Sequence, residues 1–208
     1  MLAAGAIVSS PVPAAIVEGV AARGYAVVPA AAPPALVAAL RRCAVARDAA
    51  GELAPAGVCR GAARHVHAGI RGDRIAWLDP ASHAAAETDI LAYFESLRVE
   101  CNRALLLGLF EFEGHFALYP PGASYARHRD RFRDDDARML SCVLYLNDAW
   151  LPACGGALRL HLDSGRTLDV LPDEGTLVVF LSERFEHEVL PATRPRLALT
   201  GWFRRRGA

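Results

Sequence analysis

The chain has 208 residues, of which 53% are hydrophobic, and its 23 basic and 23 acidic side chains give a formal net charge of zero. This length can bury one sizeable core, so we expect a single domain over residues 1–208. The balanced charge gives no broad basic surface for nucleic acid, and every basic residue is Arg, which excludes chemistry that needs a Lys amine, such as Schiff-base formation or a P-loop nucleotide site.

The N-terminal residues 2–17 are apolar but do not form a signal-peptide pattern, because no Lys or Arg precedes them and Pro11 and Pro13 interrupt them. We expect this segment to be loosely structured. No other apolar run has the roughly 18 to 20 residues of a membrane span, so we expect a soluble, cytoplasmic protein with no membrane partner. The five cysteines are widely spaced and include no CxxC pair, which argues against a disulfide framework and against a zinc knuckle.

Two helices are predicted in the N-terminal half. A strand-like segment at residues 25–28 is followed by Pro33 and Pro34, which open a helix with an apolar face up to Cys43. A longer helix is predicted from about Thr88 to Leu109, because apolar side chains recur there at helical spacing and Gly108 is placed to end the run.

From about residue 110 the pattern changes to short apolar or alternating runs between turn residues. Seven strands are predicted, at residues 116–119, 140–146, 158–162, 167–170, 177–180, 187–190 and 196–203. Strands this short at regular intervals are typical of a β-sandwich or barrel. We therefore predict an α+β, mainly β fold: a double-stranded β-helix (jelly roll) over residues 111–206, supported by helices within residues 1–110.

His128 and Asp130 form the first candidate site. In a strand or at its end, residues two apart point to the same face, so both side chains can reach one metal ion. His187, at the start of another predicted strand, is the candidate third ligand. Two His and one carboxylate leave coordination positions open, which suits iron(II) oxygen chemistry, whereas zinc more often takes a closed shell or three His. Each motif alone also fits an ordinary structural or solvated role.

Arg196 makes this pattern more specific. It lies nine residues after His187 and opens the apolar strand 196–203, where a charged side chain is unexpected. A guanidinium can bind a carboxylate through two parallel charge-assisted hydrogen bonds, and it stays charged when buried.

With these residues in place, the sequence resembles the prolyl 4-hydroxylase-like 2-oxoglutarate oxygenases, in particular the hypoxia-type prolyl hydroxylases and their bacterial relatives. The resemblance covers about two-thirds of the chain, in the blocks Ile70–Trp77, Tyr119–Asp130, Val143–Trp150, Gly155–Arg159, His187–Pro191, Arg196 and Trp202–Phe203. It implies an Fe(II)- and 2-oxoglutarate-dependent dioxygenase that consumes O2, releases succinate and CO2, hydroxylates C4 of a prolyl residue, and uses L-ascorbate as a reductant.

Carried over to this chain, the resemblance also implies roles for individual residues. It makes the iron ligands His128, Asp130 and His187. It assigns to the co-substrate 2-oxoglutarate the residues Arg196, Tyr145, Thr200 and Tyr119, with Arg196 and Tyr145 on the distal carboxylate. A core aromatic in an apolar strand would give the same sequence signal as Tyr145.

The substrate expected from the resemblance is a prolyl residue within a protein rather than free proline. Residues 58–73, rich in Gly, Arg and His, resemble the family's finger loop, which closes over a bound peptide, although an ordinary exposed loop has a similar composition. The candidate substrate-binding residues are Arg138, Trp202, Tyr125, Arg71 and Asp73. A translation factor or a ribosomal protein is the partner expected by family analogy.

Two features depart from the family pattern. The segment from Tyr119 to His128 is one residue shorter than in the hypoxia-type enzymes, which leaves open whether Tyr119 and Tyr125 both keep their places. Residues 131–136 form a charged run that is typical of a solvated loop. Three alternatives also stay open: an oxygenase acting on free proline or another small molecule, a non-catalytic iron-binding jelly roll, and a zinc hydrolase.

Overall fold

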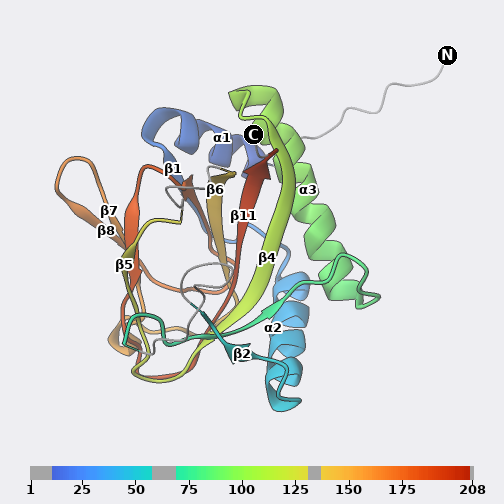
Figure 1. The fold of residues 1–208 in the computed structure, drawn as a ribbon, viewed down its shortest axis with the longest axis vertical. Helices are drawn as coiled ribbons and strands as arrows, with labels where there is room; N and C mark the ends of the chain where they lie inside the picture. The colour runs from blue at the N-terminus through green and yellow to red at the C-terminus, as the bar shows by residue number, and fades with distance from the viewer. Residues whose placement is uncertain (1–10, 58–68, 131–136, 207–208) are drawn as a thin grey trace.

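The computed structural model describes residues 11–57, 69–130 and 137–206 (Figure 1). Its helices are α1 (Pro11–Arg23), α2 (Pro34–Ala49) and α3 (Ala85–Leu105), with a short 3-10 turn at Pro152–Cys154. Its strands are β1 (Tyr25–Val28), β2 (Ala54–Pro55), β3 (Arg74–Trp77), β4 (Leu109–Tyr119), β5 (Tyr125–His128), β6 (Arg138–Tyr145), β7 (Leu158–His161), β8 (Thr167–Val170), β9 (Leu177–Leu181), β10 (Glu186–Val189) and β11 (Arg196–Arg205).

The strands form two antiparallel sheets. The larger sheet has the order β1-β9-β6-β11-β4-β3-β2, and the smaller has the order β5-β10-β7-β8. Figure 1 shows α3 running along β4 on one side of the larger sheet, while β5, β7 and β8 lie on the other side. This two-layer arrangement with N-terminal helices confirms the predicted jelly roll. One domain over residues 1–208 stays a proposal, supported by the pairing of β1 with β9.

The two faces of the larger sheet have different tasks. On β11, Leu199 and Phe203 pack into the core beneath the helices, while Ala198 packs between the two sheets. Because side chains alternate along a strand, Arg196, Thr200 and Trp202 are on the same face as Ala198. The alternation thus directs the predicted functional side chains of β11 toward the smaller sheet.

The structure corrects several predicted boundaries. The N-terminal segment expected to be loose is helical from Pro11 onward, because Ile16 and Val20, one turn apart, are both buried. Helix α3 ends at Leu105, before the predicted stop at Gly108, and its C-cap residue Leu106 takes the left-handed conformation, at φ 55°. Strand β4 begins at Leu109, seven residues before its predicted start.

Other sequence predictions have mixed outcomes. Most of the predicted finger loop, residues 58–68, and the charged run 131–136 lie outside the described residues. Among the residues that the structure describes, no helix is long and apolar enough to cross a membrane. The four cysteines in the described ranges are free.

Candidate active site

Three side chains from neighbouring segments of the smaller sheet meet at one point. Strand β10 pairs with β5 so that His187 lies opposite His128, and Asp130 follows β5 directly. The Nε2 atom of His128 is 3.6 Å from one Asp130 carboxylate oxygen, and that of His187 is 3.5 Å from the other. One ligand atom from each residue lies within 4.8 Å of the other two, so the three residues can hold a metal ion.

The protonation states of these groups suit a cation. The Nδ1–H of His128 donates to the Ala126 carbonyl at 2.7 Å, which leaves Nε2 free to ligate. Burial lowers the pKa of His187 to about 4, so its ring is neutral at pH 7. Burial alone would raise the pKa of the Asp130 carboxyl, but His187 and His128 hold it well below its usual range, so the group is a carboxylate.

A buried serine pair supports the carboxylate. The Ser141 hydroxyl donates to Oδ2 of Asp130 at 2.7 Å, and it lies 2.9 Å from the hydroxyl of Ser182. Ser141 was not predicted as a site residue, because a Ser in the middle of β6 belongs to no motif. The bond fixes the Asp130 side chain through a strand of the opposite sheet.

The second group of functional residues, which we call the unpaired end, consists of Arg196 and Tyr145. Both are buried, and the Arg196 guanidinium carbon lies 5.1 Å from the centre of the Tyr145 ring. Arg196 Nε donates to the Gly156 carbonyl at 2.8 Å, but its Nη2 atom and the Tyr145 hydroxyl have no hydrogen-bond partner among the described residues. Buried donors without partners are costly, so this pair fits a ligand that brings an acceptor such as a carboxylate.

Gly156 is required beside Arg196. Its φ is +75°, and a Cβ atom there would lie 2.9 Å from the Ala192 side chain and 3.4 Å from Cδ of Arg196. Any larger residue would therefore strain the backbone and press on the guanidinium stem.

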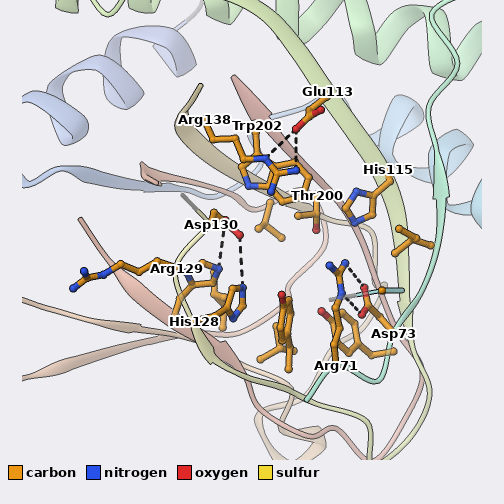
Figure 2. Close-up of a pocket in the computed structure, with 18 of the residues that line it drawn as sticks. Arg71, Asp73, Glu113, His115, His128, Arg129, Asp130, Arg138, Thr200 and Trp202 are labelled. Carbon is orange, nitrogen blue, oxygen red and sulfur yellow. Dashed lines mark hydrogen bonds and ion pairs between the residues drawn. The ribbon is translucent and has the colours of Figure 1, made fainter. Parts of the chain in front are cut away.

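The third group, which we call the paired wall, consists of two ion pairs. Arg71 donates two hydrogen bonds to Asp73, at 2.7 and 2.9 Å, and its guanidinium carbon lies 4.8 Å from the centre of the Tyr125 ring. Arg138 bonds Glu113 at 2.9 Å, and its guanidinium carbon lies 3.5 Å from the centre of the Trp202 ring. Figure 2 shows the two pairs on opposite sides of His115.

One pocket of about 570 Å³ connects the three groups. All the predicted site residues line it except Tyr145, which packs against Arg196. Despite the shortened segment, Tyr119 and Tyr125 both line the pocket, and the Tyr125 ring stacks on His128 with 3.6 Å between ring centres. The pocket is also lined by residues that were not predicted as site residues, among them Trp77, Glu113 and His115.

The missed residues had a weak signal in the sequence. Glu113 and His115 are four and two residues before Ala117 on β4, so they share its face with Tyr119. Had the strand been extended back to Leu109, this alternation would have placed them in the pocket.

Comparison with known proteins places these features in a family. Residues 114–204 match the model of the 2OG-Fe(II) oxygenase superfamily. A crystal structure of a Pseudomonas putida prolyl-4-hydroxylase superposes with a TM-score of 0.86 and 52% identity, covering 94% of this chain and 100% of that one. A Trichoplax adhaerens prolyl hydroxylase, in complex with a peptide fragment of the oxygen degradation domain of hypoxia inducible factor, gives a TM-score of 0.84 and 25% identity, covering 93% and 89%.

A curated human relative matches over a shorter range. Egl nine homolog 1 is 33% identical over 143 residues, which is 64% of this chain and 33% of that protein, so the match spans about a third of the relative's length. The full-length match at 52% identity, the superfamily model and the clustered His128, Asp130 and His187 agree with one another. The chain belongs to the 2OG-Fe(II) oxygenase superfamily and is a homologue of the prolyl 4-hydroxylases.

Proposed function

We propose that this protein is an Fe(II)- and 2-oxoglutarate-dependent dioxygenase that hydroxylates C4 of a prolyl residue in a protein substrate. The observation that carries the proposal is that one pocket joins a two-His, one-Asp cluster to a buried Arg196 with an unpartnered guanidinium nitrogen. The first group suits iron(II), and the second suits a carboxylate.

Each group of the pocket has a distinct task in this proposal. His128, Asp130 and His187 would hold iron(II), which when bound supplies the oxidation of substrate by O2, coupled to decarboxylation of 2-oxoglutarate to succinate and CO2. Arg196 would bind the distal carboxylate of 2-oxoglutarate with help from the Tyr145 hydroxyl, while Thr200 and Tyr119 line the same pocket. Ser141 would keep the Asp130 carboxylate oriented, and Trp202 would form an aromatic wall for the substrate.

The paired wall favours a prolyl residue within a chain over free proline. A free amino acid carries an ammonium and a carboxylate, and a site for it would need an anion and a cation that are not already engaged. Here Arg71 and Asp73 bind each other, as do Arg138 and Glu113. Arg129 also lines the pocket, but it is exposed, and its side chain extends away from Asp130 in Figure 2. The peptide complex of the Trichoplax adhaerens relative supports the same choice.

The test begins with anaerobic addition of Fe(II) and 2-oxoglutarate, which should give the visible metal-to-ligand charge-transfer band of such complexes. Oxygen and proline-containing peptides are then added, and succinate release is measured together with a gain of one oxygen by mass spectrometry. Oxidation of free proline faster than any peptide would favour the small-molecule alternative. Iron binding without succinate release would favour a non-catalytic jelly roll.

Three finer parts of the proposal come from the sequence: the reductant and the protein substrate from the family resemblance, and the compartment from the composition of the chain. L-ascorbate would act as the reductant that restores oxidised iron. The protein substrate would be a translation factor or a ribosomal protein, and the compartment would be the cytoplasm. Pull-down of host proteins with a metal-substituted form that cannot turn over, followed by a hydroxylation assay on the captured proteins, would test the substrate directly.

A further inference from the structure

His115 is a buried residue of the pocket that the proposed function does not use. It lies on β4, its side chain is fully buried, and it lines the pocket. Neither ring nitrogen has a hydrogen-bond partner in the part of the chain that the structure describes. Leaving a buried polar group unpaired costs free energy, so an imidazole with two unpaired nitrogens indicates a partner that comes with a ligand.

The surroundings of His115 place it on the substrate side of the pocket. Its ring lies edge-on to Trp77, with 4.8 Å between ring centres, and 5.5 Å from the ring of Trp202. The indole Nε1 of Trp202 is also buried and has no partner among the described residues. Figure 2 shows His115 across the pocket from His128 and Asp130, with Thr200 and Trp202 between them.

The co-substrate cannot be the missing partner if it binds Arg196. In the strand register, Arg196 lies opposite Tyr119 and Thr200 lies opposite His115. On β4, His115 is four residues away from Tyr119. At the rise of a β-strand the backbones at Tyr119 and His115 are roughly 13 Å apart, more than a five-carbon dicarboxylate spans. The Arg196 guanidinium stays on the Tyr119 side, with its carbon 5.2 Å from the centre of that ring. The group that reaches His115 therefore belongs to the other ligand of the pocket.

The charge state of His115 indicates which kind of ligand group can hydrogen-bond its ring. Burial, with Arg71 and Arg138 nearby, lowers the pKa of His115 to about 3, so the ring is neutral at pH 7. A neutral imidazole has one donor and one acceptor. It therefore suits a group that offers both, as successive peptide units of a main chain do, and it does not suit a carboxylate.

We propose that His115, together with the Trp202 indole N–H, hydrogen-bonds the main chain of the substrate segment beside the target prolyl residue. This inference rests on the proposed function and names a specificity-determining residue for it. Its role is to bind the substrate chain, not to take part in the oxidation. A substrate that lacks a flanking peptide unit would leave both groups unpaired.

The sign of the stability change in a His115 variant distinguishes the proposed role from a purely structural one. His115→Met keeps the volume similar and removes two unpaired buried nitrogens, so the thermal midpoint should stay the same or rise. The same variant should lose substrate affinity, because the hydrogen bonds to the peptide are gone. A residue that served only to support the fold would show the opposite stability change.

The experiment uses the Zn(II)-substituted protein with 2-oxoglutarate, which cannot turn over, and short blocked peptides with one proline flanked by alanines. Calorimetric titration should show peptide affinity lower by roughly three- to tenfold in His115→Met, with partial recovery in His115→Gln, which keeps a donor and an acceptor. Affinity for 2-oxoglutarate, read from the charge-transfer band of the anaerobic Fe(II) form, should not change. The matched control is His161→Met, because His161 bonds Glu188 outside the pocket.

The outcomes distinguish this inference from the proposed function. Unchanged peptide affinity in both His115 variants would overturn the inference alone. Weaker 2-oxoglutarate binding in His115→Met would also overturn it, because the ring would then serve the co-substrate. A wild-type protein that binds the peptides without hydroxylating them would contradict the proposed function and leave the role of His115 supported. Wild-type protein that neither binds nor hydroxylates any of them would overturn both.

Discussion

The unpaired end and the paired wall of the pocket use the same residue type in opposite ways. Arg196 is buried and has a guanidinium nitrogen without a partner, whereas Arg71 is bound twice by Asp73. A cation that is already paired contributes to the fold and to the shape of the pocket. A buried cation with spare donors costs stability until a ligand supplies an anion. Whether an Arg has a partner, rather than its charge alone, thus distinguishes the residues expected to bind a ligand from those expected to shape the pocket.

The metal cluster lines the same pocket as these two regions and should give the largest effect. His187→Ala removes one of three ligands, so we expect iron binding and succinate release to be lost while the circular dichroism spectrum is kept. His161→Ala on the adjacent β7 is the matched control and should keep its iron. Metal analysis after anaerobic loading tests both. Full iron content in His187→Ala would remove this residue from the ligand set.

Arg196→Lys tests the unpaired end. A point charge replaces a planar fork, so one of two parallel bonds to the carboxylate is lost. We expect the Michaelis constant for 2-oxoglutarate to rise by roughly ten- to hundredfold, with little change in the free energy of unfolding. Arg194→Lys, two residues away and partly exposed, should leave this constant unchanged. An unchanged constant in Arg196→Lys would mean that 2-oxoglutarate binds elsewhere.

Asp73→Asn tests the paired wall. Here we expect the stability of the fold to change, and not the binding of 2-oxoglutarate. The change leaves the partly buried Arg71 cation without its anion, although the Asn oxygen still accepts one bond. We expect the free energy of unfolding to fall by about 2–3 kcal/mol, with 2-oxoglutarate affinity unchanged. Denaturant titration measures the free energy of unfolding, and the charge-transfer band of the anaerobic Fe(II) form measures the affinity for 2-oxoglutarate.

The control for Asp73→Asn is a pair with the same geometry at the surface. Arg159 donates two hydrogen bonds to Asp169, at 2.7 and 2.8 Å, but both side chains are largely exposed to solvent. Asp169→Asn should therefore change stability little, because water screens the charges and replaces the lost bond. Equal losses in the two variants would show that burial does not distinguish the paired wall from the surface.

The sequence was sufficient for features that depend on local spacing. His128 and Asp130 share a face because they are two residues apart, and Arg196 was conspicuous because it opens an apolar strand. The strand at Thr167–Val170 was predicted with its bounds because turn residues flank it on both sides. In each case the neighbours along the chain carry the information.

The sequence was insufficient where a partner comes from a distant strand. Glu113 meets Arg138 because the register of β4, β11 and β6 brings them together. Ser141 meets Asp130 because β6 of the larger sheet packs against the smaller sheet. The start of β4 was missed because its first residues alternate between charged and aromatic side chains with exposed neighbours, which does not mark a buried strand. Whether Arg196 meets an acidic partner likewise depends on these registers, whereas Arg71 pairs with Asp73 only two residues away.

The smallest expected effect compares two tyrosine hydroxyls. The hydroxyl of Tyr145 has no partner among the described residues, whereas that of Tyr93 donates to the Ala31 carbonyl at 2.8 Å on the helix side of the core. Tyr145→Phe should weaken 2-oxoglutarate binding by roughly three- to tenfold and leave stability unchanged or slightly higher, because it removes an unpaired buried group. Tyr93→Phe should lower the free energy of unfolding by about 1 kcal/mol and leave 2-oxoglutarate binding unchanged. Denaturant titrations measure the stability of the two variants, and anaerobic titrations measure their affinity for 2-oxoglutarate. If Tyr145→Phe loses stability as Tyr93→Phe does and binds 2-oxoglutarate normally, then Tyr145 is a core residue and Arg196 alone forms the unpaired end.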